Sequence, residues 1–236
     1  HERSIHADTS LAFSLEIQEA LRDDLKIVVM SATLEQSTLQ ALLPEAEYIE
    51  SQGRSFPVEY RYQPLATNDY LPAKMATTIE SLIEKEQGSL LAFLPGVSAI
   101  KQVQERLQHL SGNVDVLPLY GQLTFAQQQQ AIAPAKRGQR KVVLATNIAE
   151  TSLTIEGIRL VVDSGLERVA KFDLKTGVTK LEQIKISQSS AEQRAGRAGR
   201  IEEGLCVRLY SEAQLQQQPL VPVPEILHSD LSSLLA

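Results

Sequence analysis

The alternation of short apolar segments with longer amphipathic segments constrains the fold of this 236-residue sequence more than any other feature. The apolar segments are rich in β-branched residues and are continuously apolar, which is typical of strands buried on both faces of a parallel sheet. Such alternation favours an α/β fold with helices on both faces. Strands are expected at residues 25–30, 90–94, 114–117, 141–145 and 160–162.

Apolar residues three or four positions apart predict the helices between these strands. They are expected at residues 10–21, 35–42, 72–85, 97–110, 125–133 and 190–198. From 165 to 187 the pattern instead alternates around Lys175-Thr176-Gly177, which predicts an inserted β-hairpin. Its role stays open between a strand-separating wedge and a sheet extension.

Glycine and proline break the periodicity between residues 50 and 57, which indicates a linker there. We therefore expect residues 1–52 to belong to one domain and residues 53–210 to a second. Residues 211–236 are expected to be a linker and the start of a truncated helical module. The sequence opens on His1 in a polar stretch, which favours a fragment of a longer protein.

Composition predicts a soluble protein with a real core, since 43% of the residues are apolar and 22% are charged. The net charge of -6 argues against a whole-surface grip on nucleic acid, so any such contact needs a local groove. The single cysteine, Cys206, is expected to be buried and inert and favours the reducing cytoplasm. No apolar run is long enough for a membrane span, and the histidines lack metal-ligand spacing, so neither a membrane nor a metal site is expected.

The strongest motif is the run Gln193-Arg194-Ala195-Gly196-Arg197-Ala198-Gly199-Arg200. Ser189 and Glu192 predict a capping box at the start of its helix, and the spacing then places Gln193, Arg197 and Arg200 on one face. Guanidinium groups suit the bidentate binding of phosphate, although a solvated basic helix end is an equal alternative. The two glycines suggest close backbone approach or an early helix end.

Two loops after predicted strands carry hydroxyl and amide side chains, where a sheet of this kind would receive a ligand. One runs from Ala145 to Gly157 and the other is Ser31-Ala32-Thr33. Either could instead be an ordinary turn held by its own side chains. A basic cluster at Lys136, Arg137, Arg140 and Lys141 could face a nucleic-acid backbone or be a solvated loop.

In this order and spacing, these strings resemble the DEAH-box helicases of superfamily 2, and among them the bacterial HrpB type. His1-Glu2-Arg3-Ser4 resembles the end of the Asp-Glu-x-His motif, and Ser31-Ala32-Thr33 resembles the coupling motif. Leu91 to Gly96, Ala145 to Gly157 and Gln193 to Arg200 resemble the fourth, fifth and sixth motifs. The resemblance covers nearly the whole chain.

The resemblance implies a RecA-like fold, with the end of a first lobe in residues 1–52 and a second lobe in 53–210. It implies that Gln193 positions the attacking water, that Arg197 and Arg200 are arginine fingers for ATP, and that His1 contacts the sixth motif. Thr154, Glu156 and Ile132 would lie at the nucleotide, where relatives place an aromatic residue instead of Ile132. Gly96, Thr146 and Asn147 would hold the RNA or DNA backbone, and Ser31 and Thr33 would couple ATP to lobe movement.

One departure is an absence, because no Gly-x-x-x-x-Gly-Lys-Ser/Thr occurs in the sequence. The phosphate loop and the magnesium ligands would therefore come from the missing part of the first lobe. We expect an ATP- and Mg²⁺-dependent RNA helicase in the intact protein and an inactive chain in isolation. The alternatives are a non-catalytic lobe that binds single-stranded nucleic acid or a protein, and a small-molecule transferase on the same fold.

Overall fold

The computed structural model describes residues 56–110 and 112–223. Residues 56–169 and 182–221 form one compact unit, and residues 170–181 belong to a second. The helices expected at 10–21 and 35–42, the strand at 25–30 and the site residues His1, Ser31 and Thr33 lie outside the described residues.

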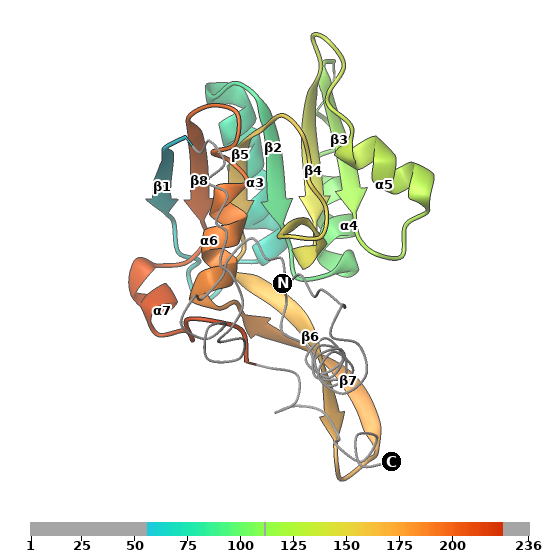
Figure 1. Ribbon diagram of the computed structural model, residues 1–236, viewed down its shortest axis with the longest axis vertical. Coiled ribbons are helices and arrows are strands. Elements are labelled where there is room, and N and C mark those ends of the chain that lie inside the picture. Colours follow the sequence, from blue (N-terminus) through green and yellow to red (C-terminus); the bar gives the residue numbers. More distant parts are fainter. Residues whose placement is uncertain (1–55, 111, 224–236) are drawn as a thin grey trace, which may run out of the picture. The chain divides into compact units, whose positions relative to one another are not determined.

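A six-stranded, wholly parallel sheet forms the centre of the larger unit, in the order β1-β8-β5-β2-β4-β3 (Figure 1). The strands are β1 (Val58–Tyr62), β2 (Ser89–Phe93), β3 (Val114–Leu119), β4 (Arg140–Ala145), β5 (Ile158–Asp163) and β8 (Gly204–Arg208). All five residues of β2 and of β8 are buried, whereas the edge strand β1 is largely exposed. The predicted α/β fold is confirmed.

The helices of the unit are α3 (Leu71–Lys85), α4 (Val97–Arg106), α5 (Phe125–Ile132), α6 (Gln188–Gly196) and α7 (Glu212–Gln216). One core cluster joins α3 and α4 to alternate strand residues such as Leu90 and Ala92. A second joins α5 and α6 to the intervening residues, such as Leu91 and Phe93. The period-2 alternation of the strands thus provides apolar side chains to both faces, and Figure 1 shows α6 in front of the sheet with α3 behind it.

The predicted hairpin is present as β6 (Leu166–Asp173) and β7 (Val178–Lys185), which form a two-stranded sheet. At its turn, the Lys175 amide donates to Asp173 Oδ1 over 2.9 Å, and Gly177 adopts a φ of 68°. Glycine reaches this left-handed conformation without the steric penalty of a side chain. The role of the hairpin stays a prediction.

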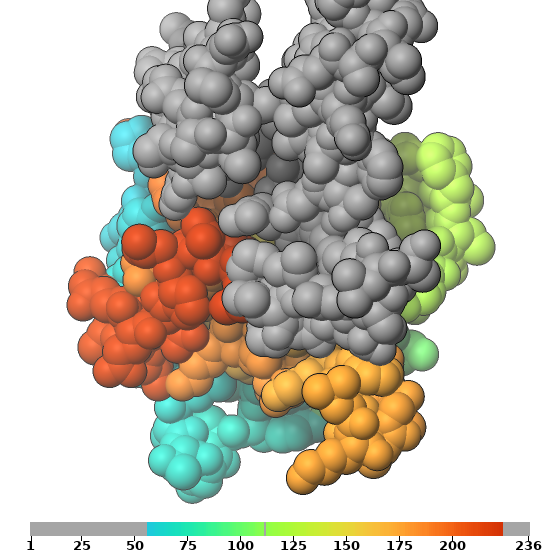
Figure 2. Space-filling model, turned by 60° about the horizontal axis from the view of Figure 1, so that its bottom comes forward, coloured from blue at the N-terminus to red at the C-terminus, as the bar shows by residue number. Residues whose placement is uncertain are grey.

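The predicted start of α6 is wrong by two residues. Ser187, and not Ser189, is the N-cap, and its hydroxyl accepts from the Ser190 amide. The amides of Gln188 and Ser189 instead donate to the carbonyl oxygens of Pro219 and Leu220, each over 2.9 Å. The chain after α7 therefore satisfies the free end of α6. Figure 1 shows this red segment near the orange helix, and red atoms adjoin orange atoms in the space-filling view of Figure 2.

Two strands and one helix were not predicted. β1 has a mostly exposed edge-strand pattern, and β8 has only three apolar residues between Gly204 and Arg208, so neither gave a clear signal. The short helix α7 lies in the Gln-rich part that was expected to be a linker, and a capping box of Ser211 and Gln214 starts it.

Candidate functional site

The carboxyl ends of three central strands lie side by side at one edge of the sheet. Phe93 at the end of β2 is in register with Ala145 of β4 on one side and Asp163 of β5 on the other. The predicted fourth motif follows from the end of β2, and the predicted fifth motif follows from the end of β4. Parallel strands thus bring these motifs to one edge, where ligands of such sheets bind.

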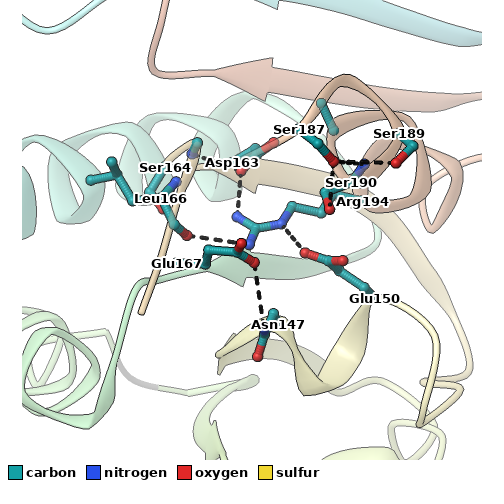
Figure 3. A network of polar contacts seen from close by, with 12 residues as sticks. Asn147, Glu150, Asp163, Ser164, Leu166, Glu167, Ser187, Ser189, Ser190 and Arg194 are labelled. Atoms are coloured by element: carbon teal, nitrogen blue, oxygen red, sulfur yellow. Dashed lines mark hydrogen bonds and ion pairs between the residues drawn. The ribbon is translucent and has the colours of Figure 1, made fainter. Parts of the chain in front are cut away.

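Arg194 of α6 lies at the centre of a buried polar network at this edge (Figure 3). Its Nε donates to Glu150 Oε1 over 2.7 Å, and its Nη1 donates to Asp163 Oδ1 over 2.9 Å. Its Nη2 donates to the Leu166 carbonyl, and the guanidinium lies 4.9 Å from the centre of the Phe93 ring. One side chain therefore joins α6 to the fourth motif, the fifth motif and the root of the hairpin.

The charges of this network affect one another strongly because the side chains are out of water. Burial alone would lower the pKa of Arg194, but Asp163 and Glu150 outweigh it and hold the pKa above its ordinary value. Burial raises the pKa of Glu150 to about 7, and Arg194 opposes that rise. One guanidinium is shared between two carboxylates, and its attraction does not fully offset the effect of burial on Glu150.

Arg197 has an unsatisfied donor within the described residues. The side chain is buried, and its Nη2 donates to the Glu150 carbonyl oxygen, whereas its Nη1 has no hydrogen-bond partner in the part of the chain that the structure describes. Burial lowers the pKa of Arg197 to about 10, and the positive charge of Arg200 adds to this effect. A buried N–H beside a second cation is an arrangement that suits a multiply charged anion such as phosphate.

The predicted single face of Gln193, Arg197 and Arg200 is wrong for Arg200. Helix α6 ends at Gly196 with Arg197 as its C-cap, so the exposed Arg200 lies beyond the helix. After the helix, the chain passes close to Phe56 at Gly199, where an added Cβ would lie 2.6 Å from the Phe56 carbonyl oxygen. The Phe56 amide also donates to the Gly199 carbonyl over 2.7 Å. Both glycine interpretations, close approach and an early helix end, are confirmed.

The predicted nucleotide residues come from the end of helix α5 and from the loop of the fifth motif, which meet in the fold. The Glu156 amide donates to the Ile132 carbonyl oxygen over 3.5 Å, which brings the end of α5 to the fifth motif. Thr154 and Glu156 are exposed, and Ile132 is half-buried. Residues from α5, this loop and α6 share one core cluster, which includes Ala131, Ile155, Ala195 and Ala198. The cluster connects the predicted nucleotide loop with the arginine motif.

The predicted nucleic-acid residues meet the first part of β6. Gly96 is the extended N-cap residue of α4, and an added Cβ there would lie 2.8 Å from Arg168 Cδ. Asn147 Nδ2 donates to Glu167 Oε2 over 3.5 Å, and Thr146 directly precedes Asn147. The exposed Arg168 was not predicted, and it places a positive charge beside these residues.

Two residues of the predicted basic cluster are structural. Arg140 donates to the carbonyl oxygens of Gly88, Ile83 and Glu86 at the end of α3. Lys141 is buried and donates to the carbonyl oxygens of Ala131 and Ala133 at the end of α5. Cations at helix C-termini satisfy carbonyl groups that have no partner within the helix. For Arg140 and Lys141, both earlier interpretations are therefore wrong: contact with a nucleic-acid backbone and a position in a solvated loop.

Sequence reasoning missed the buried network of Arg194, Glu150 and Asp163 that lies beside the predicted site. The available signal was weak: Arg194 lies among the buried residues Ala191, Ala195 and Ala198, and an aspartate ends the apolar strand β5. Among residues 56–110 and 112–223, no group of three or more His, Cys, Asp or Glu side chains could hold a metal ion. The same residues contain no helix with the length and apolarity needed to cross a membrane.

Comparisons with known proteins agree with this geometry. The family model described as Helicase conserved C-terminal domain matches residues 73–202. ATP-dependent RNA helicase HrpB of Escherichia coli (strain K12) is 53% identical over 236 residues, which are 100% of this chain and 29% of that protein. ATP-dependent RNA helicase HrpA of the same organism is 37% identical over 242 residues, covering 100% of this chain and 18% of HrpA.

A solved structure gives the same result. The crystal structure of Escherichia coli DEAH/RHA helicase HrpB matches with a TM-score of 0.94 and 53% identity, over 100% of this chain and 30% of that chain. The chain therefore spans less than a third of the length of these relatives. The resemblance to HrpB-like DEAH-box helicases is confirmed, and the chain belongs to the helicase conserved C-terminal domain family.

Proposed function

We propose that this chain is the second motor lobe of a DEAH-box ATP-dependent RNA helicase and completes an ATP site with a first RecA-like lobe. One observation carries the proposal: the buried Arg197 Nη1 has no partner within the described residues and lies beside a second cation, Arg200. Two guanidinium groups repel each other unless an anion lies between them. The γ-phosphate of ATP supplies that anion.

ATP and Mg²⁺ fit the residues present only in part. Arg197 and Arg200 would contact the γ-phosphate, Gln193 would orient the attacking water, and Thr154, Glu156 and Ile132 would line the ribose and base. The phosphate loop and the Mg²⁺ ligands would come from the first lobe, because the sequence contains no phosphate-loop motif. His1 would contact the sixth motif, and Ser31 and Thr33 would couple the two lobes. When bound, ATP supplies the phosphoryl group whose hydrolysis drives translocation.

RNA would bind across Gly96, Thr146 and Asn147, with DNA as a second possible substrate. The proposal rests on the exposed Arg168 beside Gly96, because a protein with a net charge of -6 needs local positive charge to hold a phosphate backbone. The buried, free Cys206 favours the reducing cytoplasm.

A second candidate is a non-catalytic lobe that binds single-stranded nucleic acid or a protein. The missing phosphate-loop motif favours it for the chain in isolation. The two candidates differ in whether the arginine pair contributes to hydrolysis.

Arg197→Ala tests the proposal in a protein that carries this chain behind a phosphate-loop lobe. We expect RNA-stimulated ATPase to fall on the order of 10³-fold, as when an arginine finger is removed, with RNA affinity nearly unchanged. Arg61→Ala, at an exposed arginine of the edge strand β1 that lies outside the predicted site, is the matched control and should retain full ATPase activity. Retention of ATPase in Arg197→Ala would refute the arginine-finger role and favour the non-catalytic lobe.

A further inference from the structure

Glu150 contacts both the predicted nucleic-acid loop and the predicted arginine finger. Its amide donates to the Asn147 carbonyl oxygen over 3.0 Å. Its carbonyl oxygen accepts from Arg197 Nη2, and its carboxylate accepts from Arg194 Nε over 2.7 Å. These three contacts use three different groups of a residue that is only 3% exposed.

Arg194 fixes the carboxylate of Glu150 from a rigid position. The other two nitrogens of its guanidinium are held by Asp163 and by the Leu166 carbonyl, and its face lies over Phe93. All of these groups belong to the edge of the sheet or to the root of β6. A planar guanidinium that makes several hydrogen bonds fixes the orientation of the Glu150 carboxylate better than a single flexible contact would.

Arg197, in contrast, is held by a single hydrogen bond among the described residues. The Glu150 carbonyl is the only hydrogen-bond acceptor of the Arg197 guanidinium among the described residues, and Nη1 has none. A displacement of the Glu150 peptide therefore moves the guanidinium. A shift of about 1 Å in a catalytic group can change a rate on the order of 10²-fold.

We propose that Glu150 is a positioning residue that couples nucleic-acid binding at Thr146 and Asn147 to the orientation of Arg197. This inference rests on the proposed function. Nucleic acid on the loop shifts or steadies the segment that runs from Thr146 through a 3-10 turn, Asn147–Ala149, into Glu150. The Glu150 carbonyl transmits this change to Arg197, and Arg194 limits the positions that Glu150 can adopt. The contacts form one continuous chain, as coupling through a packed structure requires.

Asp163 provides a matched control for the side chain of Glu150. Both carboxylates pair with Arg194 in the buried network, at 2.9 Å and 2.7 Å. Asp163 also accepts from Tyr210 Oη and the Gly165 amide, on the side of the hairpin root. No hydrogen bond among the described residues joins Asp163 directly to Arg197 or to residues 146–150, and its influence on Glu150 is electrostatic, since its charge raises the pKa of Glu150. A general loss of stability should therefore follow either substitution, whereas a loss of coupling should follow only one.

The experiment uses Glu150→Gln and Asp163→Asn in the protein that carries a phosphate-loop lobe. The affinity for single-stranded RNA is measured without nucleotide and with ADP and aluminium fluoride, and the ratio of the two dissociation constants is the coupling factor. We expect a factor of at least about 5 in the unmodified protein, within the usual range of coupling between sites. Glu150→Gln should bring it close to one with RNA affinity in the absence of nucleotide changed less than about twofold, and Asp163→Asn should retain it.

Glu150→Asp is the second variant, because it keeps the charge but is too short to reach Arg194 Nε. It should also lose coupling, and thermal unfolding of each variant separates this effect from misfolding. Equal coupling factors in Glu150→Gln and the unmodified protein would overturn this inference. Equal losses of coupling in Glu150→Gln and Asp163→Asn would overturn it as well. Either result would leave the proposed function standing. An unmodified protein that lacks both ATPase and coupling would instead overturn the proposed function.

Discussion

The Arg194 guanidinium lies 2.9 Å from Asp163 Oδ1, and neither side chain is exposed to solvent. A buried charge is stable only when other groups replace the water it has lost. Here Glu150 and the Leu166 carbonyl complete that replacement. The pair therefore holds the arginine motif against the ends of the central strands. The packing of this edge of the sheet depends on the Arg194 side chain.

Replacing Arg194 by methionine should destabilise the protein strongly. The change keeps much of the side-chain volume but leaves the carboxylates of Glu150 and Asp163 buried without their cation. Breaking a buried pair from one side typically costs about 3–5 kcal/mol of the free energy of unfolding. Urea unfolding followed by circular dichroism measures the loss.

Arg61→Ala is the control for that measurement. Arg61 pairs with Glu59 at 3.1 Å, and both side chains are substantially exposed. Exposed ion pairs contribute little, so the free energy of unfolding should change by less than about 1 kcal/mol. Similar losses in Arg194→Met and Arg61→Ala would contradict the central place of Arg194 in the network.

Gly165→Ala should cost more stability than Gly177→Ala. Both glycines have a positive φ, 73° and 68°, which costs an alanine about 1–2 kcal/mol. An added Cβ at Gly165 would also lie 2.5 Å from Tyr210 Cδ1, whereas nothing lies within 4 Å at Gly177. Overpacking of this kind adds about 1–3 kcal/mol. Thermal melts of the two variants compare the costs, and a larger effect at Gly177 would show that the Tyr210 contact is unimportant.

The Cys206 thiol should be unreactive in the folded protein. Burial raises its pKa to about 12 from an ordinary value of 9.0, and the nearby Asp163 adds to this rise while Arg208 opposes it. The folded state thus disfavours the thiolate, so this thiol contributes stability that is present below pH 9.0 and lost as the pH rises toward about 12.

Labelling with a disulfide reagent such as DTNB at pH 8 tests this expectation. The folded protein should label only as fast as it unfolds, and urea-unfolded protein should label at once. Rapid labelling of the folded chain would place Cys206 at an accessible position and contradict its burial in β8.

Sequence periodicity predicted the central strands and four helices of the described residues because each provides apolar groups in a regular pattern to one of two cores. It missed β8 because the buried Arg208 interrupts the apolar run. Two nitrogens of that side chain donate to Tyr62 and Ala191, which are distant in sequence, and its Nε has no hydrogen-bond partner among the described residues. The arginine motif was recognised from its residues. The partners of its arginines could not be predicted, since Glu150 and Asp163 reach Arg194 only after the parallel strands are assembled.

The capping of α6 illustrates the same limit. Ser189 and Glu192 satisfy the local spacing of a capping box, yet the segment after α7 satisfies the first amides of the helix. A local motif competes with partners that the sequence places some 30 residues away. The same reason explains why Arg140 and Lys141 look like a binding cluster in sequence and serve as helix caps in the fold.

ATP hydrolysis with and without single-stranded RNA tests the central claim most directly. It is measured on this chain alone and on the same chain extended N-terminally by a lobe that contains the phosphate loop. The account predicts hydrolysis by the extended protein only, with stimulation by RNA. A well-folded extended protein that hydrolyses no ATP in either condition would contradict the account and leave a binding lobe as the better description.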